Sequence, residues 1–173
     1  MNTPDKSFLI TEIPGYTPHI SRLICMMNYA RRITLGIIKG LSIKDLDYLI
    51  DKDSNSIGAL LMHLAAVEYY YQAFTFEERE LSNEERNKWK AGIELGEIAR
   101  SEIKGNDLEY YIKILTDLRK RTLELFKEKN DEWLHKEFAF WGGAPSNSYF
   151  VWFHVYEDEI NHRGQISWIK KRL

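Results

Sequence analysis

Near the C-terminus, residues 151–169 read VWFHVYEDEINHRGQISWI and place two metal-ligand side chains within an otherwise apolar helical stripe. At about 100° per residue, one face of this helix carries Val151, Val155, Asp158, His162, Ile166 and Ile169. Residues four apart are neighbours on a helix surface, so Asp158 and His162 lie side by side among aliphatic residues. A carboxylate that faces a core must be paired, bound to a metal or neutralised. The stretch therefore predicts a helix whose buried face carries two side chains able to bind a metal ion.

Three further segments have the apolar spacing of helices and end at residues that favour helix ends. The first runs over about 20–39 and is closed by Gly40. The second, over about 57–76, follows the cap-rich cluster Ser54-Asn55-Ser56. The third is capped by Asn106 or Asp107 and extends to about 126. Four helices of about 20 residues with long connections predict an all-α four-helix bundle.

The connections are predicted from their charge and their turn residues. Residues 42–53 form a polar connector with one short helical turn, and the charged stretch 77–105, broken by three glycines, predicts a long crossover with short helical pieces. Residues 130–147 contain Trp-Gly-Gly-Ala-Pro and predict a loop without helix. No strand is predicted. The expected organisation is one domain over residues 1–173, with an irregular lead-in over 1–17.

Composition excludes several classes of function. A net charge of −2 gives no basic surface for nucleic acid, and no stretch is long and apolar enough to span a membrane. The N-terminus has no apolar run of the signal-peptide type, and the single cysteine, Cys25, fits a reducing compartment. We therefore expect a cytoplasmic protein.

A metal site needs a third ligand, and His63 is the best candidate. It lies inside the second helix on a face shared with Leu60, Val67, Tyr70 and Phe74. For His63 alone, a core histidine satisfied by one hydrogen bond is the commoner case. Asp158 and His162 change this balance, because inward ligands from two facing helices are the usual geometry of metal sites in bundles. Two histidines and one carboxylate suit Zn²⁺, Fe²⁺, Ni²⁺ or Mn²⁺.

A buried ion pair is the competing explanation for Asp158. Arg31 and Arg119 lie on the apolar stripes of the first and third helices, and each begins the pattern R-x-x-T-L. Either arginine could pair with Asp158, or could bind a carboxylate of a cofactor. Glu157 and Glu159 flank Asp158; either could orient a ligand or act as a base, although a solvated helix flank is the commoner role.

The sequence resembles the DinB/YfiT-like superfamily over about residues 15–173. The similarity lies in HVYEDEINHRGQI near the C-terminus, in NSIGALLMHLAAVE around His63 and in ARRITLGIIKGLS of the first helix. Members are four-helix bundles, frequently homodimers, in which three histidines hold a divalent metal. Carried onto this chain, the ligand positions are His63, Asp158 and His162, so an aspartate replaces the middle histidine.

Two functions of different classes fit these residues, the first of them implied by the resemblance. In the first, the metal activates a low-molecular-weight thiol and the protein is a thiol S-transferase-like enzyme, in which Arg31 or Arg119 binds the cofactor. In the second, Asp158 is ion-paired, the metal site is degenerate and the protein is a non-enzymatic dimeric scaffold. Metal content distinguishes the two.

A homodimer is expected from the other side of the last helix. Trp152, Phe153, Tyr156 and Ile160 lie opposite Asp158 and His162, where an isolated bundle helix would show water a polar surface. An apolar patch of this kind usually marks an interface. Alternatively, the loop 133–145, which contains Phe138, Phe140 and Trp141, folds back and covers it.

Overall fold

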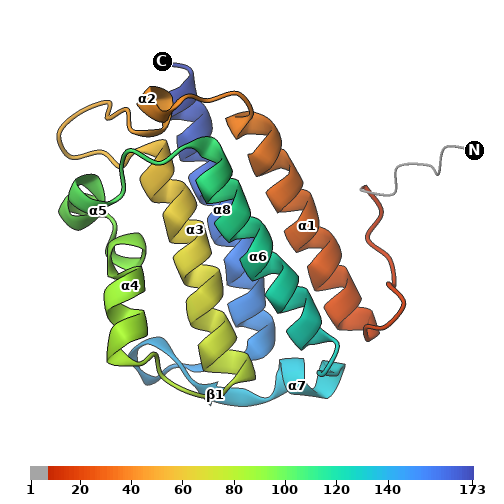
Figure 1. The fold of residues 1–173 in the computed structure, drawn as a ribbon. Helices are drawn as coiled ribbons and strands as arrows, with labels where there is room; N and C mark the ends of the chain where they lie inside the picture. Colours follow the sequence, from red (N-terminus) through yellow and green to blue (C-terminus); the bar gives the residue numbers. More distant parts are fainter. Residues whose placement is uncertain (1–7) are drawn as a thin grey trace, which may run out of the picture.

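Four long helices lie side by side and form the frame of the molecule (Figure 1). In this computed structural model, which describes residues 8–173, they are α1 (Pro18–Ile38), α3 (Ile57–Tyr71), α6 (Leu108–Phe126) and α8 (Ser148–Lys170). Helices α3 and α6 run in one direction and α1 and α8 in the other (Figure 1). The predicted all-α four-helix bundle is confirmed.

Side-chain caps explain where three of these helices begin. Ser56, Asp107 and Asn147 each accept a hydrogen bond from the backbone N–H three residues later, at the first turns of α3, α6 and α8. Such a cap satisfies one of the N–H groups that the first turn leaves without an intrahelical partner. The caps predicted for α3 and α6 are therefore confirmed, whereas the cap of α8 by Asn147 was not predicted.

Helix α1 is capped by a residue from a distant part of the chain. The carboxylate of Asp131 accepts hydrogen bonds from the backbone N–H groups of His19 and Ile20, at 3.1 and 3.3 Å. Asp131 begins the short helix α7 (Asp131–His135), so this cap fixes α7 against the start of α1. A negative charge at a helix N-terminus is also favourable for the helix dipole.

The predicted connections before α6 are confirmed. The polar connector contains the single turn α2 (Ile43–Leu46), and α3 continues as the π-helical segment η1 (Gln72–Phe76). The charged crossover contains α4 (Asn83–Glu94) and α5 (Gly96–Glu102). These two helices lie beside α3, outside the four-helix frame (Figure 1).

The prediction for residues 130–147 was wrong in two respects. The segment contains helix α7, the 3₁₀ turn η2 (Trp141–Gly143), and a hairpin of β1 (Glu137–Ala139) with β2 (Pro145–Asn147). Gly142 and Gly143 have φ values of 63° and 81°, which glycine adopts without strain, so they reverse the chain rather than merely interrupt it. Three-residue strands are too short for an alternation of apolar and polar residues to reveal them.

The core consists of two apolar clusters separated by a polar layer. One cluster surrounds Leu60, Leu115 and Ile166, and the other surrounds Met27 and Trp152. At the level between them, the four helices contribute Arg31, Thr34, Glu68, Arg119, Thr122 and Glu159, all buried. Each of the four long helices therefore buries at least one polar side chain at mid-length.

The buried face of α3 differs from the predicted one. Ala65, Glu68 and Tyr71 are buried, whereas Val67 and Tyr70 are only partly buried and lie toward α4. The sequence of α3 is apolar almost all round, so the spacing of apolar residues could not locate its inner face.

The lead-in predicted over 1–17 lies partly outside the described residues, and residues 8–17 form neither helix nor strand. Within residues 8–173, no helix combines the length and the apolar character needed to cross a membrane.

Candidate metal centre

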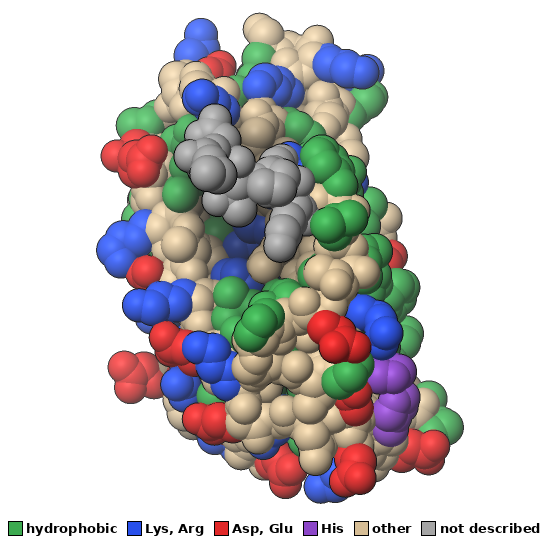
Figure 2. All heavy atoms as spheres, turned by 90° about the vertical axis from the view of Figure 1, so that its right-hand side faces the viewer, with side chains coloured by type: hydrophobic (Ala, Val, Ile, Leu, Met, Phe, Trp, Pro, Cys, Tyr) green, Lys and Arg blue, Asp and Glu red, His purple; other side chains and the backbone are tan. Residues whose placement is uncertain are grey.

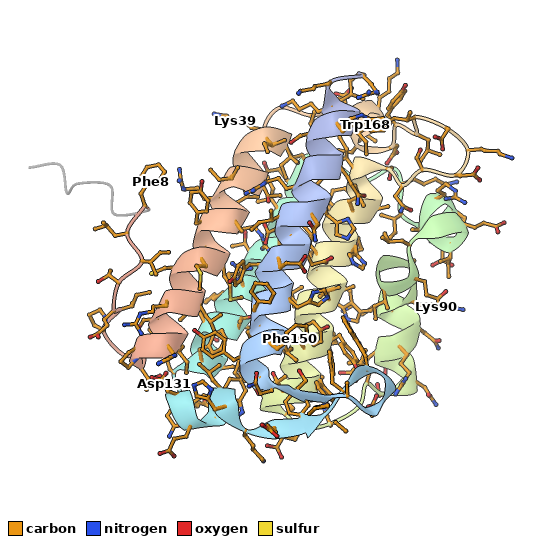
Figure 3. The ribbon with its side chains drawn as sticks, turned by 180° about the vertical axis from the view of Figure 1, so that it is seen from behind. Phe8, Lys39, Lys90, Asp131, Phe150 and Trp168 are labelled. Carbon is orange, nitrogen blue, oxygen red and sulfur yellow. The ribbon has the colours of Figure 1, made fainter. Side chains whose placement is uncertain are left out.

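His63, Asp158 and His162 come together where α3 passes α8. Nε2 of His63 lies 3.3 Å from Oδ2 of Asp158, and Nε2 of His162 lies 3.3 Å from Oδ1 of the same carboxylate. One ligand atom from each residue lies within 4.8 Å of the other two. Between 13% and 15% of each side chain is exposed, so the cluster faces the bundle but remains reachable. Figure 3 shows α8 between α1 and α3, with α4 beyond α3.

The orientation of His63 is set by a backbone carbonyl on α4. Nδ1 of His63 lies 2.8 Å from the carbonyl oxygen of Gly92, and a carbonyl can only accept, so Nδ1 carries the proton. In the neutral imidazole, Nε2 then has a lone pair that points at a carboxylate oxygen of Asp158. Two acceptors at this distance repel unless a proton or a metal ion lies between them. A proton or a metal ion between the two atoms would remove this repulsion.

Gly92 permits this contact because it has no side chain. A Cβ at this position would lie 3.0 Å from the Cβ of Ala66 and 3.1 Å from the carbonyl oxygen of Met62, both on α3. Such distances are shorter than ordinary van der Waals contact. Helix α4 therefore approaches α3 closely enough for its carbonyl group to reach His63.

The charges of the cluster support one another. Burial disfavours ionisation of Asp158, but hydrogen bonds and charges from His162 and His63 outweigh it and hold the pKa of Asp158 below its ordinary range. Burial likewise disfavours the protonated form of His162, and the hydrogen bond and charge of Asp158 reverse this effect and raise its pKa. The carboxylate is thus ionised at neutral pH, as a metal ligand must be.

A cavity of about 520 Å³ opens beside the cluster, and His63 is part of its wall. Val67, Tyr70 and Tyr71 line it from α3, and Arg86 and Lys90 line it from α4. Trp141 of the η2 turn and His154 of α8 also line it, and their rings meet edge to face with centroids 5.2 Å apart. The cavity is the size of small-molecule sites and has the aromatic walls that are common in them.

The arginines pair with two glutamates, not with Asp158. Arg31 donates from Nε to Glu159 at 2.9 Å and from Nη2 to Glu68 at 3.1 Å, and Arg119 donates from Nε to Glu68 at 2.8 Å. The alternative pairing of Asp158 with an arginine was therefore wrong. Successive residues of α8 face different neighbours, so Asp158 reaches the histidines while Glu159 reaches the arginines.

Glu159 was expected on a solvated flank of its helix, and this was also wrong. The Glu159 side chain is buried and ion-paired with Arg31. Glu157 is partly exposed and contacts His154 at 3.0 Å. Glu68 was not predicted as a buried residue, because the apolar residues of α3 surround the helix and do not locate its inner face. A backbone carbonyl such as that of Gly92 has no residue-type signal at all.

Comparison with known families identifies the chain. The family described as Mycothiol-S-transferase matches residues 22–173. The protein belongs to the mycothiol S-transferase family. This match confirms the resemblance to the DinB/YfiT-like superfamily and covers the polar layer and all three residues of the cluster. No curated protein matches the chain.

In this mycothiol S-transferase family member, the donor set fits a divalent ion. Two imidazoles and one carboxylate suit Zn²⁺ and its neighbours in the first transition series. His63, as oriented by Gly92, offers a lone pair, and Asp158 offers an ionised oxygen. Three protein ligands leave coordination positions open, as catalytic metal sites require.

Proposed function

We propose that the protein is a thiol S-transferase that depends on a divalent metal ion held by His63, Asp158 and His162. The observation that carries this proposal is that Nε2 of His63 and Nε2 of His162 each lie 3.3 Å from an oxygen of the Asp158 carboxylate. Family membership supports the transfer of a thiol. The metal is Zn²⁺, Ni²⁺, Fe²⁺ or Mn²⁺, all of which accept this donor set.

A bound divalent ion would supply a Lewis acid that lowers the pKa of a low-molecular-weight thiol. The residues around it have complementary roles. Val67, Tyr71 and Trp141 give the cavity apolar walls that restrict water around the thiol and its electrophilic partner. Lys90 places a positive charge along α4, where a negatively charged part of a substrate would bind, whereas Arg86 beside it is paired with Glu80.

Metal content tests the ligand assignment. We expect about one divalent ion per chain after purification without chelator, by elemental mass spectrometry. His63→Ala and His162→Ala should each lose this ion, because two remaining ligands make a weak site. His135→Ala, which changes an exposed histidine of α7, is the matched control and should keep it. A protein that contains no metal and fails to bind Zn²⁺, Ni²⁺ or Mn²⁺ at micromolar concentrations would contradict the proposal.

Activity tests the second half of the proposal. The metal-loaded protein should accelerate conjugation of a low-molecular-weight thiol to an electrophilic bimane, and chelation should remove the acceleration. A metal-loaded protein that leaves a broad panel of thiols and electrophiles unreacted would favour the non-enzymatic scaffold instead.

We further propose that the protein acts in the cytoplasm as a homodimer. The support for a dimer is the partly exposed apolar surface of Tyr29, Phe153 and Ile160 on α1 and α8. Reducing conditions fit the single, unpaired Cys25.

A further inference from the structure

A second hollow lies on a different side of the bundle, between α1 and α6. It measures about 520 Å³ and is lined by Tyr16, Leu35, Thr116 and Leu123, with Arg31 and Arg119 among its walls. Figure 2, which faces α1, shows basic side chains inside a hollow on this surface. The metal cluster lies instead between α3 and α8, and the cavity beside it shares no lining residue with this hollow.

One residue that lines this hollow, Arg119, has a buried donor without a partner in the described part of the chain. Arg119 is 7% exposed, and its Nε and Nη2 groups donate to Glu68 at 2.8 and 3.2 Å. Its Nη1 group has no hydrogen-bond partner among the described residues. A buried donor without a partner costs free energy, and native proteins rarely leave one in this state. The free edge of the guanidinium group therefore indicates that something else accepts its hydrogen bonds.

The charges around the hollow favour an anion as that partner. The two arginines are balanced by Glu68 and Glu159 beneath them. At the rim, Lys120 and Lys127 outnumber the one acid there, Glu124. The local excess is thus positive, and a guanidinium edge binds carboxylate and phosphate oxygens with charge-assisted hydrogen bonds.

We propose that the hollow between α1 and α6 is a binding site for a small anion, a carboxylate or a phosphate. Arg119, with its unsatisfied Nη1, is the proposed buried donor, and the exposed Lys120 and Lys127 attract the ligand. Leu35 and Leu123 give the same hollow an apolar wall, which suits an organic anion with a short hydrocarbon part. The site is separate from the metal centre and does not depend on the proposed transferase activity.

The test is a titration of the full chain, treated with chelator, with sodium butanoate and in parallel with inorganic phosphate. The ¹⁵N–¹H signals of the arginine Nε–Hε groups report on each guanidinium. The signal of Arg119 should shift and saturate, whereas that of Arg172 at the end of α8 should not move. Saturation with butanoate alone would assign an organic carboxylate, and saturation with phosphate alone would assign a phosphate group.

Three variants separate a site from general attraction by a charged surface. Lys120→Gln and Lys127→Gln should each weaken binding about threefold, as expected for the loss of an exposed charge. Thr116→Trp should abolish binding by filling the hollow without removing any charge. Lys113→Gln is the matched control, because this lysine of α6 is exposed and pairs with Asp117, so binding should be unchanged.

Two outcomes would overturn the proposal. The Arg119 signal could respond without saturation to both anions, or Thr116→Trp could bind as well as the unchanged protein. In either case, water rather than an anion would satisfy Nη1 of Arg119. A thermal melt of each variant establishes that the comparison is made between folded proteins.

Discussion

Glu68 is the residue on which the polar layer depends. It is fully buried and accepts hydrogen bonds from Arg119, from Arg31 and from the hydroxyl of Thr122. Burial alone would raise the pKa of Glu68, but the two guanidinium groups outweigh burial and lower it. The carboxylate is therefore ionised and compensates two buried positive charges.

Glu68→Gln should destabilise the fold strongly. The change keeps the shape but leaves two buried arginines with one carboxylate, and removing one partner of a buried ion pair costs about 3–5 kcal/mol. Urea unfolding measures the loss. Glu128→Gln, at an exposed position after α6, should change the free energy of unfolding by less than about 0.5 kcal/mol. Equal effects of the two changes would show that the ion pairs add no net stability.

The metal cluster makes the stability of the chelator-treated protein depend on pH. The folded-state pKa of Asp158 is lowered, so its contribution is present above its unfolded pKa of about 3.9 and is lost as pH falls. The pKa of His162 is raised, so its contribution is fully present below about 6.5 and is lost as pH rises through the folded value. The ionised Asp158 and the protonated His162 together therefore stabilise the fold most between about pH 3.9 and about pH 6.5.

We therefore expect the chelator-treated protein to melt at a higher temperature near pH 5.5 than near pH 8, relative to His162→Gln measured alongside. Excess Zn²⁺ should reverse this trend, because protons compete with the metal for the same atoms. A melting temperature that responds to pH identically in both proteins would show that His162 and Asp158 are not coupled.

Replacement of Asp158 by histidine tests its role as a ligand. Asp158 contacts only the two histidines of the cluster among the described ion pairs, so Asp158→His leaves the Arg31–Glu159 pair intact. We expect Asp158→His to fold and to retain or tighten metal binding, since imidazole suits the same metals. Calorimetric titration with Zn²⁺ measures the affinity. Loss of binding would mean that the shorter, charged side chain is required.

At the scale of single helices, the contact of α4 with α3 positions His63. Gly92→Ala would place a Cβ 3.0 Å from the Cβ of Ala66. The contact between α3 and α4 would be overpacked, which should lower the free energy of unfolding by about 1–3 kcal/mol. Because α4 must move away, the Gly92 carbonyl group should release His63, and Zn²⁺ affinity should fall as well. Thermal melts and Zn²⁺ titration measure the two effects.

Gly36→Ala is the matched control for this prediction. Gly36 lies within α1 on its exposed side, and an added Cβ there meets nothing within 4 Å. Alanine should stabilise this helix by about 0.5–1 kcal/mol and leave Zn²⁺ affinity unchanged. If both alanine variants keep full affinity, the contact with Gly92 does not position the ligand.

The helices were predictable because each kind of evidence for them is local. Apolar spacing located α1, α6 and α8 within a few residues, and side-chain caps marked the starts of α3 and α6. The stripe of α8 predicted that Asp158 and His162 would be neighbours. The inner face of α3 was not predictable, because its apolar residues surround the helix. The role of Gly92 depends on tertiary packing and on a backbone atom, neither of which a sequence pattern records.

At the scale of the whole molecule, the aromatic residues of α8 separate into two groups. Trp152 is 0% exposed, packs against Phe76 and Phe126 and donates its indole N–H to Thr75. Its predicted place on an outer interface was therefore wrong, because η1 and the end of α6 enclose the start of α8. Phe153 and Ile160 remain partly exposed at 39% and 41%.

The exposed group is not covered by the loop that precedes α8. Phe138 and Phe140 pack against Phe74 of η1. Among the aromatic pairs of the described residues, Phe140 meets α8 at Phe150, with ring centroids 6.4 Å apart. Phe8, Leu9 and Ile10 extend the apolar surface past α1, and Figure 2 shows hydrophobic side chains along this face. Surfaces of this kind in soluble proteins usually mark an interface.

A second copy of the chain is the partner that this surface predicts, since one patch can pair with itself about a two-fold axis. Ile160→Glu should convert a dimer at tens of micromolar into a monomer, because it would bury an unpaired carboxylate at the centre of the contact. Light scattering measures the mass. Ile43→Glu, at a similarly exposed isoleucine of α2 (44%), should leave the dimer intact. A monomeric mass for the unchanged protein would refute the dimer, and dissociation by both variants would place the interface elsewhere.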